Sequence, residues 1–161
     1  MMKILNKTMK SFGKDFYLTI GDTMTTDVII GHLNNTGKFG LTPLRSTEQD
    51  NPYEHYDAEN HQFIVEIKSR DFRYADWLIE KYKYEENMQA AQDSSRMFVY
   101  VTEFDNKIFV WNLYDLAWLE YELQWENDKS MPNTTEFGDK GRRYKSVAYL
   151  PENICWFTLE V

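Results

Sequence analysis

The clearest indication of the fold comes from one segment of this 161-residue chain, Tyr56-Asp-Ala-Glu-Asn-His-Gln-Phe-Ile-Val-Glu-Ile-Lys-Ser69. Its second half is rich in β-formers and is typical of a strand. Successive residues of a strand point to opposite faces of a sheet, so Val65 and Ile67 are expected to enter a core. Glu66 and Lys68 are then expected to emerge side by side on the other face.

The residues before this strand predict a β-hairpin. Asn60 favours a turn, and a turn there folds Asp57 back toward Glu66. Two carboxylates so placed repel each other unless a hard divalent cation lies between them, and oxygen ligands with room for water suit Mg²⁺ or Mn²⁺. Lys68 could then orient or deprotonate a water, or neutralise charge on a phosphodiester. In the alternative interpretation, Glu66 and Lys68 form an ordinary ion pair and Asp57 is a turn residue.

The pattern Asp57, Glu66, x, Lys68 resembles the PD-(D/E)XK nucleases, a superfamily of restriction endonucleases, phage endonucleases and Holliday-junction resolvases. The resemblance implies that Asp57 and Glu66 bind metal, with the backbone carbonyl of Ile67 as an extra ligand. Lys68 is then the lysine of the motif. The chain departs from the pattern in having Tyr56, not proline, before the first acid.

The family core runs helix, three-strand meander, helix, strand (αβββαβ). The resemblance therefore implies an α/β fold with a restriction-endonuclease-like core, in which helices flank a mixed β-sheet. That core is expected over about residues 22–113, followed by a C-terminal β extension over about 114–161, within a single nuclease-like domain. Many members also place an acid on the first helix, and Asp27 or Asp22 is the candidate here.

Three further stretches are similar to phage-encoded members of the family: Trp77–Tyr84, Phe98–Val101 and Phe109–Leu113. A segment from Asn133 to Pro151 adds a weaker similarity of the same kind. The resemblance implies a phage endonuclease, that is, a Mg²⁺- or Mn²⁺-dependent DNA hydrolase in the host cytoplasm. A branched-DNA resolvase and a non-catalytic phage accessory protein that binds DNA or a host protein stay open as alternatives. Dimerisation is common in the family, so a homodimer is also open.

Local patterns predict the remaining elements. The expected order is a helix capped by Asp22 or Thr23 and stopped by 34–37, a first strand within 39–44, strands at 53–58 and 62–69, a helix over 74–92, a hairpin of 97–104 and 107–113, a short helix over 115–124, a loop over 126–143, and strands at 144–150 and 154–160.

The formal net charge of −8 argues against tight non-specific binding to DNA, because phosphate binding normally needs a basic surface. Four cationic residues are nevertheless candidates for DNA contacts: Lys83, Lys140, Arg142 and Arg143. No apolar run approaches the roughly 20 residues that span a bilayer, so no membrane association is expected.

The single cysteine, Cys155, cannot form an internal disulfide, and the chain shows no Cys/His cluster for zinc. A reducing compartment is expected. Glycine-rich phosphate-binding loops and recognisable serine or cysteine nucleophiles are also missing from the sequence. The carboxylates of Asp57 and Glu66 therefore remain as the candidate catalytic groups. DNA structure, sequence preference, and endonuclease or exonuclease action do not follow from these patterns.

Overall fold

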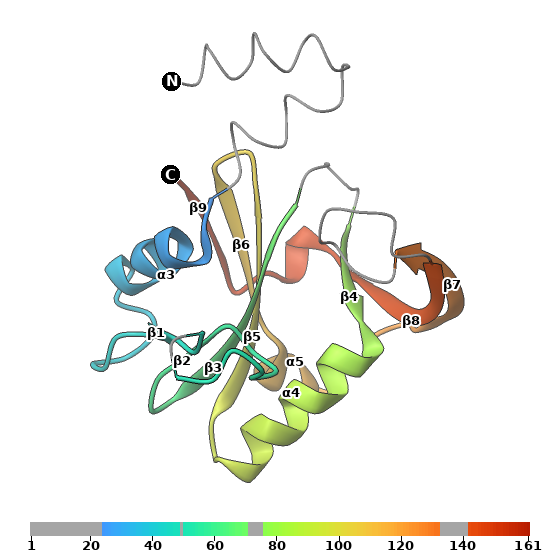
Figure 1. The fold of residues 1–161 in the computed structure, drawn as a ribbon, viewed down its shortest axis with the longest axis horizontal. Helices are drawn as coiled ribbons and strands as arrows, with labels where there is room; N and C mark the ends of the chain where they lie inside the picture. The colour runs from blue at the N-terminus through green and yellow to red at the C-terminus, as the bar shows by residue number, and fades with distance from the viewer. Residues whose placement is uncertain (1–23, 49, 71–75, 133–141) are drawn as a thin grey trace, which may run out of the picture.

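The computed structural model describes residues 24–48, 50–70, 76–132 and 142–161 (Figure 1). In chain order, the elements are α3 (Thr26–Asn35), β1 (Arg45–Ser46), β2 (Ala58–Glu59), β3 (Phe63–Ser69), β4 (Trp77–Glu80), α4 (Lys81–Asp93), β5 (Met97–Phe104), β6 (Lys107–Asn112), α5 (Leu113–Trp118), β7 (Glu126–Pro132), β8 (Arg142–Leu150), a 3₁₀ turn (Glu152–Ile154) and β9 (Phe157–Glu160).

The described strands form two sheets. The larger has the order β1-β2-β3-β5-β6-β9, in which β3 and β5 run parallel and every other neighbouring pair is antiparallel. The smaller has the order β4-β8-β7 and is antiparallel. Helices flank the mixed sheet, so the expected α/β class is confirmed at this level (Figure 1).

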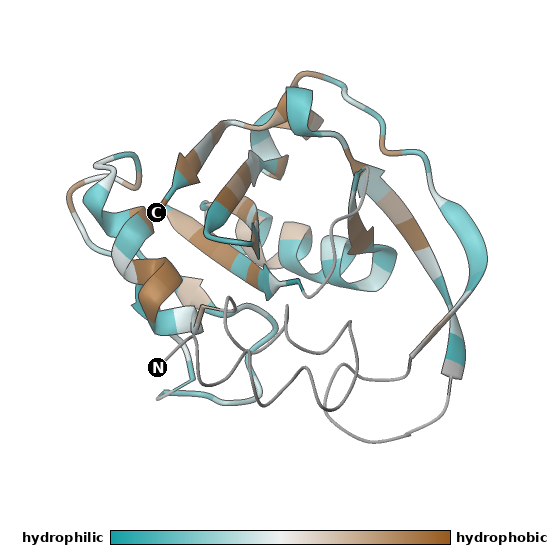
Figure 2. Ribbon diagram, turned by 90° about the horizontal axis from the view of Figure 1, so that it is seen from above, coloured by the Kyte–Doolittle hydropathy of each residue, from teal (hydrophilic) through white to brown (hydrophobic). Residues whose placement is uncertain are grey.

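Two hydrophobic clusters lie on opposite faces of the larger sheet. On one face, Ile29 and Leu33 of α3 pack with Val65 and Ile67 of β3. On the other face, residues of α4, β4 and β8 pack against Ile64 of β3 and its neighbours in β5 and β6. Figure 2 accordingly shows the hydrophobic residues gathered on the central strands. The predicted alternation along β3 is therefore confirmed, but the face that carries Glu66 is also covered.

The helix expected over 74–92 is wrong in its first part. Trp77–Glu80 is strand β4, and α4 begins only at Lys81. Trp77 and Ile79 are buried while Leu78 and Glu80 are half-buried, which is the period of two of a strand. The partner that imposes this conformation is β8, where Leu150 pairs with Trp77. A pairing so distant in sequence leaves no local signal, and Tyr74 and Ala75 lie outside the described residues.

Other element bounds also differ from the predictions. No strand forms over 39–44; the first strand in the described part of the chain is β1 at Arg45–Ser46. The strand expected at 53–58 is reduced to β2, and the helix expected over 115–124 is α5, Leu113–Trp118. The loop expected over 126–143 begins with a strand, β7, because β8 supplies its hydrogen-bonding partner.

Several local predictions are confirmed. The hairpin of β5 and β6 turns at Asp105 and Asn106, both at positive φ. Helix α3 ends before Gly37, whose φ of 70° suits glycine. Its N-cap is Thr25, whose hydroxyl accepts the N–H of Val28; the predicted caps Asp22 and Thr23 lie outside the described part of the chain. None of the helices described here is long and apolar enough to cross a membrane.

Candidate functional site

The turn between β2 and β3 is fixed by the side chain of Asn60. Its amide nitrogen donates to the carbonyls of Phe39 and Thr42, both at 2.7 Å. Its amide oxygen accepts the N–H groups of Gln62 and Phe63 at 2.9 and 2.8 Å. This saturated side chain sets the register of the hairpin, in which Ala58 pairs with Val65.

Asp57 is tied to β3 on both sides of Glu66. Its N–H donates to the carbonyl of Val65 at 2.9 Å, and its Oδ2 accepts the N–H of Ile67 at 2.7 Å. The N–H and C=O of one strand residue point to the same edge, so the carbonyl of Ile67 is directed to the side where Asp57 lies. The predicted return of Asp57 toward Glu66 is therefore present.

The carboxylate of Glu66 is buried, with 1% of the side chain exposed. Its Oε1 lies 2.7 Å from Nζ of Lys68 and 3.6 Å from Nζ of Lys83. Neither carboxylate oxygen accepts a well-aligned hydrogen bond from the described residues. Burial raises the pKa of Glu66, and the nearby charge of Asp57 raises it further, while Lys68 and Lys83 act in the opposite direction.

Lys68 is a cation in this arrangement. Burial acts to lower its pKa, but the carboxylates of Glu66 and Asp57 outweigh burial, so that the pKa of Lys68 is raised above its ordinary value. Its side chain is 37% exposed, so its ammonium group forms the solvent-facing side of the pair. Of the roles considered from the sequence, the raised pKa favours charge stabilisation and water orientation over deprotonation of water.

Helix α4 adds Lys83 to this cluster. Its Nζ donates to the carbonyl of His55 at 3.0 Å and its side chain is 30% exposed. The ring of His55 pairs with Glu86, with its Nδ1 3.0 Å from the Glu86 carboxylate. Lys83 was predicted as a DNA contact, and its proximity to Glu66 was not expected from the sequence.

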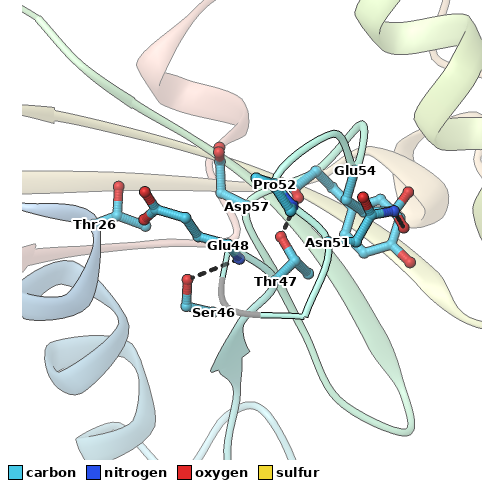
Figure 3. Close-up of a pocket in the computed structure, with 9 residues that line it drawn as sticks. Thr26, Ser46, Thr47, Glu48, Asn51, Pro52, Glu54 and Asp57 are labelled. Carbon is cyan, nitrogen blue, oxygen red and sulfur yellow. Dashed lines mark hydrogen bonds between the residues drawn. The ribbon is translucent and has the colours of Figure 1, made fainter.

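Asp57 also lines an open hollow of about 300 Å³ beside the start of α3 (Figure 3). Thr26 and Glu48 extend into the same hollow. Asp27, the predicted additional acid, is exposed and is not among the lining residues. Glu48 was not recognised as a site candidate because it stands in a polar connection with no regular spacing to Asp57.

The ligand atoms around Asp57 and Glu66 are of the kind that a hard divalent cation prefers. Asp57, Glu66 and the Ile67 carbonyl supply oxygen ligands only, and the oxygens of Glu66 are buried without aligned donors. Mg²⁺ is commonly held by one or two carboxylates while it keeps several waters. Among the residues that the structure describes, no group of three or more His, Cys, Asp or Glu side chains is arranged to hold a metal. The fit therefore depends on the carbonyl and water as additional ligands.

The four residues predicted to contact DNA do not lie together in the described structure. Lys83 and Arg143 line one open hollow at the start of α4. Arg142 belongs to β8 through its backbone, and Lys140 lies outside the described residues.

No family model matches the chain, and neither the curated proteins nor the solved structures contain a significant match.

Proposed function

We propose that this protein is a metal-dependent DNA nuclease with a restriction-endonuclease-like core. Asp57, Glu66 and Lys68 form the proposed active site for hydrolysis of phosphodiester bonds. The observation that carries the proposal is the 2.7 Å contact between Nζ of Lys68 and the buried carboxylate of Glu66. Next to this pair, the carboxylate of Asp57 accepts a hydrogen bond from the N–H of Ile67. Solvent reaches Lys68, and the hollow beside Asp57 gives access to the Asp57 carboxylate.

The order of the elements supports this proposal. Helix α3 is followed by the antiparallel strands β1, β2 and β3, then by α4 and by β5, which lies parallel to β3. This sequence agrees with the helix, meander, helix, strand order of the PD-(D/E)XK nucleases. Strand β4 departs from it, since β4 joins the second sheet before α4 begins.

Each residue has a distinct role in the proposed reaction. Asp57, Glu66 and the Ile67 carbonyl would hold Mg²⁺ or Mn²⁺, which supplies a water of lowered pKa and neutralises charge on the phosphate. Asp57 is kept in place by the Ile67 N–H, so its free oxygen remains available as a ligand. Lys68 orients the attacking water and stabilises the negative charge that builds up on the phosphate oxygens.

The rival function is that of a non-catalytic accessory protein. Lys68 and Lys83 both approach Glu66, and this ion-pair cluster would serve equally to fasten α4 to the sheet. Under this interpretation the cluster is structural, and the protein binds DNA or a host protein without cleaving it.

Cleavage of DNA in Mg²⁺ or Mn²⁺ separates the two functions. Supercoiled plasmid, linear duplex and a four-way junction are incubated with wild type, Asp57→Asn, Glu66→Gln and Lys68→Met. The nuclease proposal expects each variant to lose at least about a hundredfold in rate while remaining folded. Preference for the junction would identify a resolvase, and no cleavage of any substrate by folded wild type would favour the accessory protein.

Glu59→Gln is the matched control for these variants. Glu59 lies on the same hairpin and is also ion-paired, with its Oε2 2.8 Å from Arg96, but it is not in contact with Glu66. Its loss is expected to leave the cleavage rate within about twofold of wild type, because its partners Arg45, Arg96 and Tyr56 have no role in the proposed reaction.

A further inference from the structure

A second hollow, of about 550 Å³, opens between the start of α4 and strand β8. Figure 1 shows these two elements next to each other, and they are also in contact in the structure. The lining contains four cationic side chains, two from each element: Lys81, Lys83, Arg143 and Lys145.

The lining has an excess of positive charge in a protein whose formal net charge is −8. Two acids, Glu80 and Glu85, accompany the four cations. Lys145 pairs with Glu80 at 2.9 Å, and Lys81 pairs more loosely with Glu85 at 3.6 Å. Within the described residues Arg143 forms no ion pair, and it is exposed. Arg143 is therefore the lining cation most accessible to a phosphate group.

Two tyrosines in the same lining are unusually exposed. Tyr82 of α4 is 59% exposed and Tyr144 of β8 is 74% exposed. Cationic side chains beside exposed aromatic rings are the usual composition of surfaces that bind single-stranded nucleic acid, because phosphates contact the cations and bases stack on the rings. Bases in a duplex are already stacked on each other, so their faces are not available to stack on the tyrosine rings.

Lys83 connects this hollow to the proposed catalytic cluster. It lines the hollow, and its Nζ lies 3.6 Å from Oε1 of Glu66. A strand bound in the hollow would therefore continue toward Glu66.

We propose that this hollow binds an unpaired segment of DNA and delivers it to the cluster at Glu66. Arg143 and Lys83 contact its phosphates, and Tyr82 and Tyr144 stack on its bases. The inference rests on the proposed nuclease function and narrows its substrate class to DNA with an unpaired stretch, such as a flap, gap or branch.

Binding is tested separately from cleavage by fluorescence anisotropy in EDTA. The probes are a labelled oligothymidylate and a duplex of equal length. We expect the single strand to bind at least about tenfold more tightly than the duplex. Tyr144→Ala is expected to weaken single-strand binding about tenfold. Arg143→Ala is expected to lower the salt-dependence slope by about 0.7, as one lost phosphate contact on a single strand would.

Trp118→Ala serves as the matched control, since Trp118 is an equally exposed aromatic residue at 80% but lies outside the hollow. It is expected to bind like wild type, and all variants are checked for folding by thermal unfolding. Equal affinity for both probes, or unchanged binding by Tyr144→Ala and Arg143→Ala, would overturn the proposal. Tighter binding of polyglutamate than of oligothymidylate at equal charge concentration would overturn it in favour of an acidic protein partner.

The two proposals fail separately. Duplex cleavage that depends on Glu66 but occurs without single-strand binding leaves the nuclease standing and removes this inference. Single-strand binding that depends on Tyr144, without cleavage of any substrate, removes the nuclease and leaves a DNA-binding protein.

Discussion

Replacing Lys68 with methionine isolates the energetic role of the Glu66 cluster. Methionine keeps the unbranched stem but removes the ammonium group that lies 2.7 Å from the buried carboxylate. Breaking a fully buried ion pair costs about 3–5 kcal/mol. Lys68 is 37% exposed and Lys83 remains near the same oxygen, so we expect a smaller loss, about 2 kcal/mol of unfolding free energy near pH 8.

This loss should depend on pH in a definite direction. The pKa of Glu66 is already raised above 4.5 by burial, and removing Lys68 removes a charge that lowers it. In folded Lys68→Met, Glu66 therefore takes up a proton at a higher pH than in wild type. Once its carboxyl group is neutral, the missing ammonium group no longer costs stability. The raised pKa of Lys68 keeps its contribution present throughout the neutral range in wild type. The penalty should be complete near pH 8 and should shrink toward about pH 5.

Urea unfolding of wild type and Lys68→Met at the two pH values measures this difference. Lys129→Met is the control, since Lys129 forms a solvent-exposed pair with Glu126 at 3.3 Å and its loss should leave the unfolding curve close to that of wild type at both pH values. An equal loss at both pH values, or no loss near pH 8, would show that Glu66 is not a buried anion compensated by Lys68.

Three other outcomes follow from the structure. Trp77→Ala, which removes a fully buried ring packed 5.0 Å from Phe109, should cost about 3–5 kcal/mol in urea unfolding; a loss below about 1 kcal/mol would contradict the burial of β4. Burial raises the pKa of Cys155 to about 12, so iodoacetamide should alkylate it slowly in the folded protein and rapidly in denaturant; equal rates would show an accessible thiol. Because Glu66 must ionise to bind metal and burial raises its pKa, the acid limb of the cleavage rate at subsaturating Mg²⁺ should lie at higher pH than an ordinary exposed glutamate would give; a limb in the ordinary glutamate range would assign the titration to another group.

The sequence predicted those parts of the site that depend on local geometry. The alternation of Val65 and Ile67 with Glu66 and Lys68, and the turn at Asn60, depend on residues close together in the chain. The raised pKa of Lys68 could not be predicted, because it depends on the balance between burial and two carboxylates. The position of Lys83 beside Glu66 depends on how α4 packs against the sheet.

The second sheet was missed for a related reason. Trp77–Glu80 has both helix-compatible and strand-compatible residues, and the choice was made by β8, which follows it by about seventy residues. The same pairing turned Glu126–Pro132 into a strand despite its polar composition. The hollow that contains Arg143 and Tyr144 therefore exists only because of a long-range pairing that no local pattern specified.

The proposed reaction requires Asp57 and Glu66 to hold one divalent cation between them. Crystals of the protein soaked in Mn²⁺ and measured at a wavelength where manganese scatters anomalously test it directly. We predict a single anomalous peak within about 2.3 Å of a carboxylate oxygen of each residue, absent in Glu66→Gln crystals soaked in the same way. Ordered Asp57 and Glu66 side chains with no peak between them, and with Lys68 still paired to Glu66, would contradict the claim.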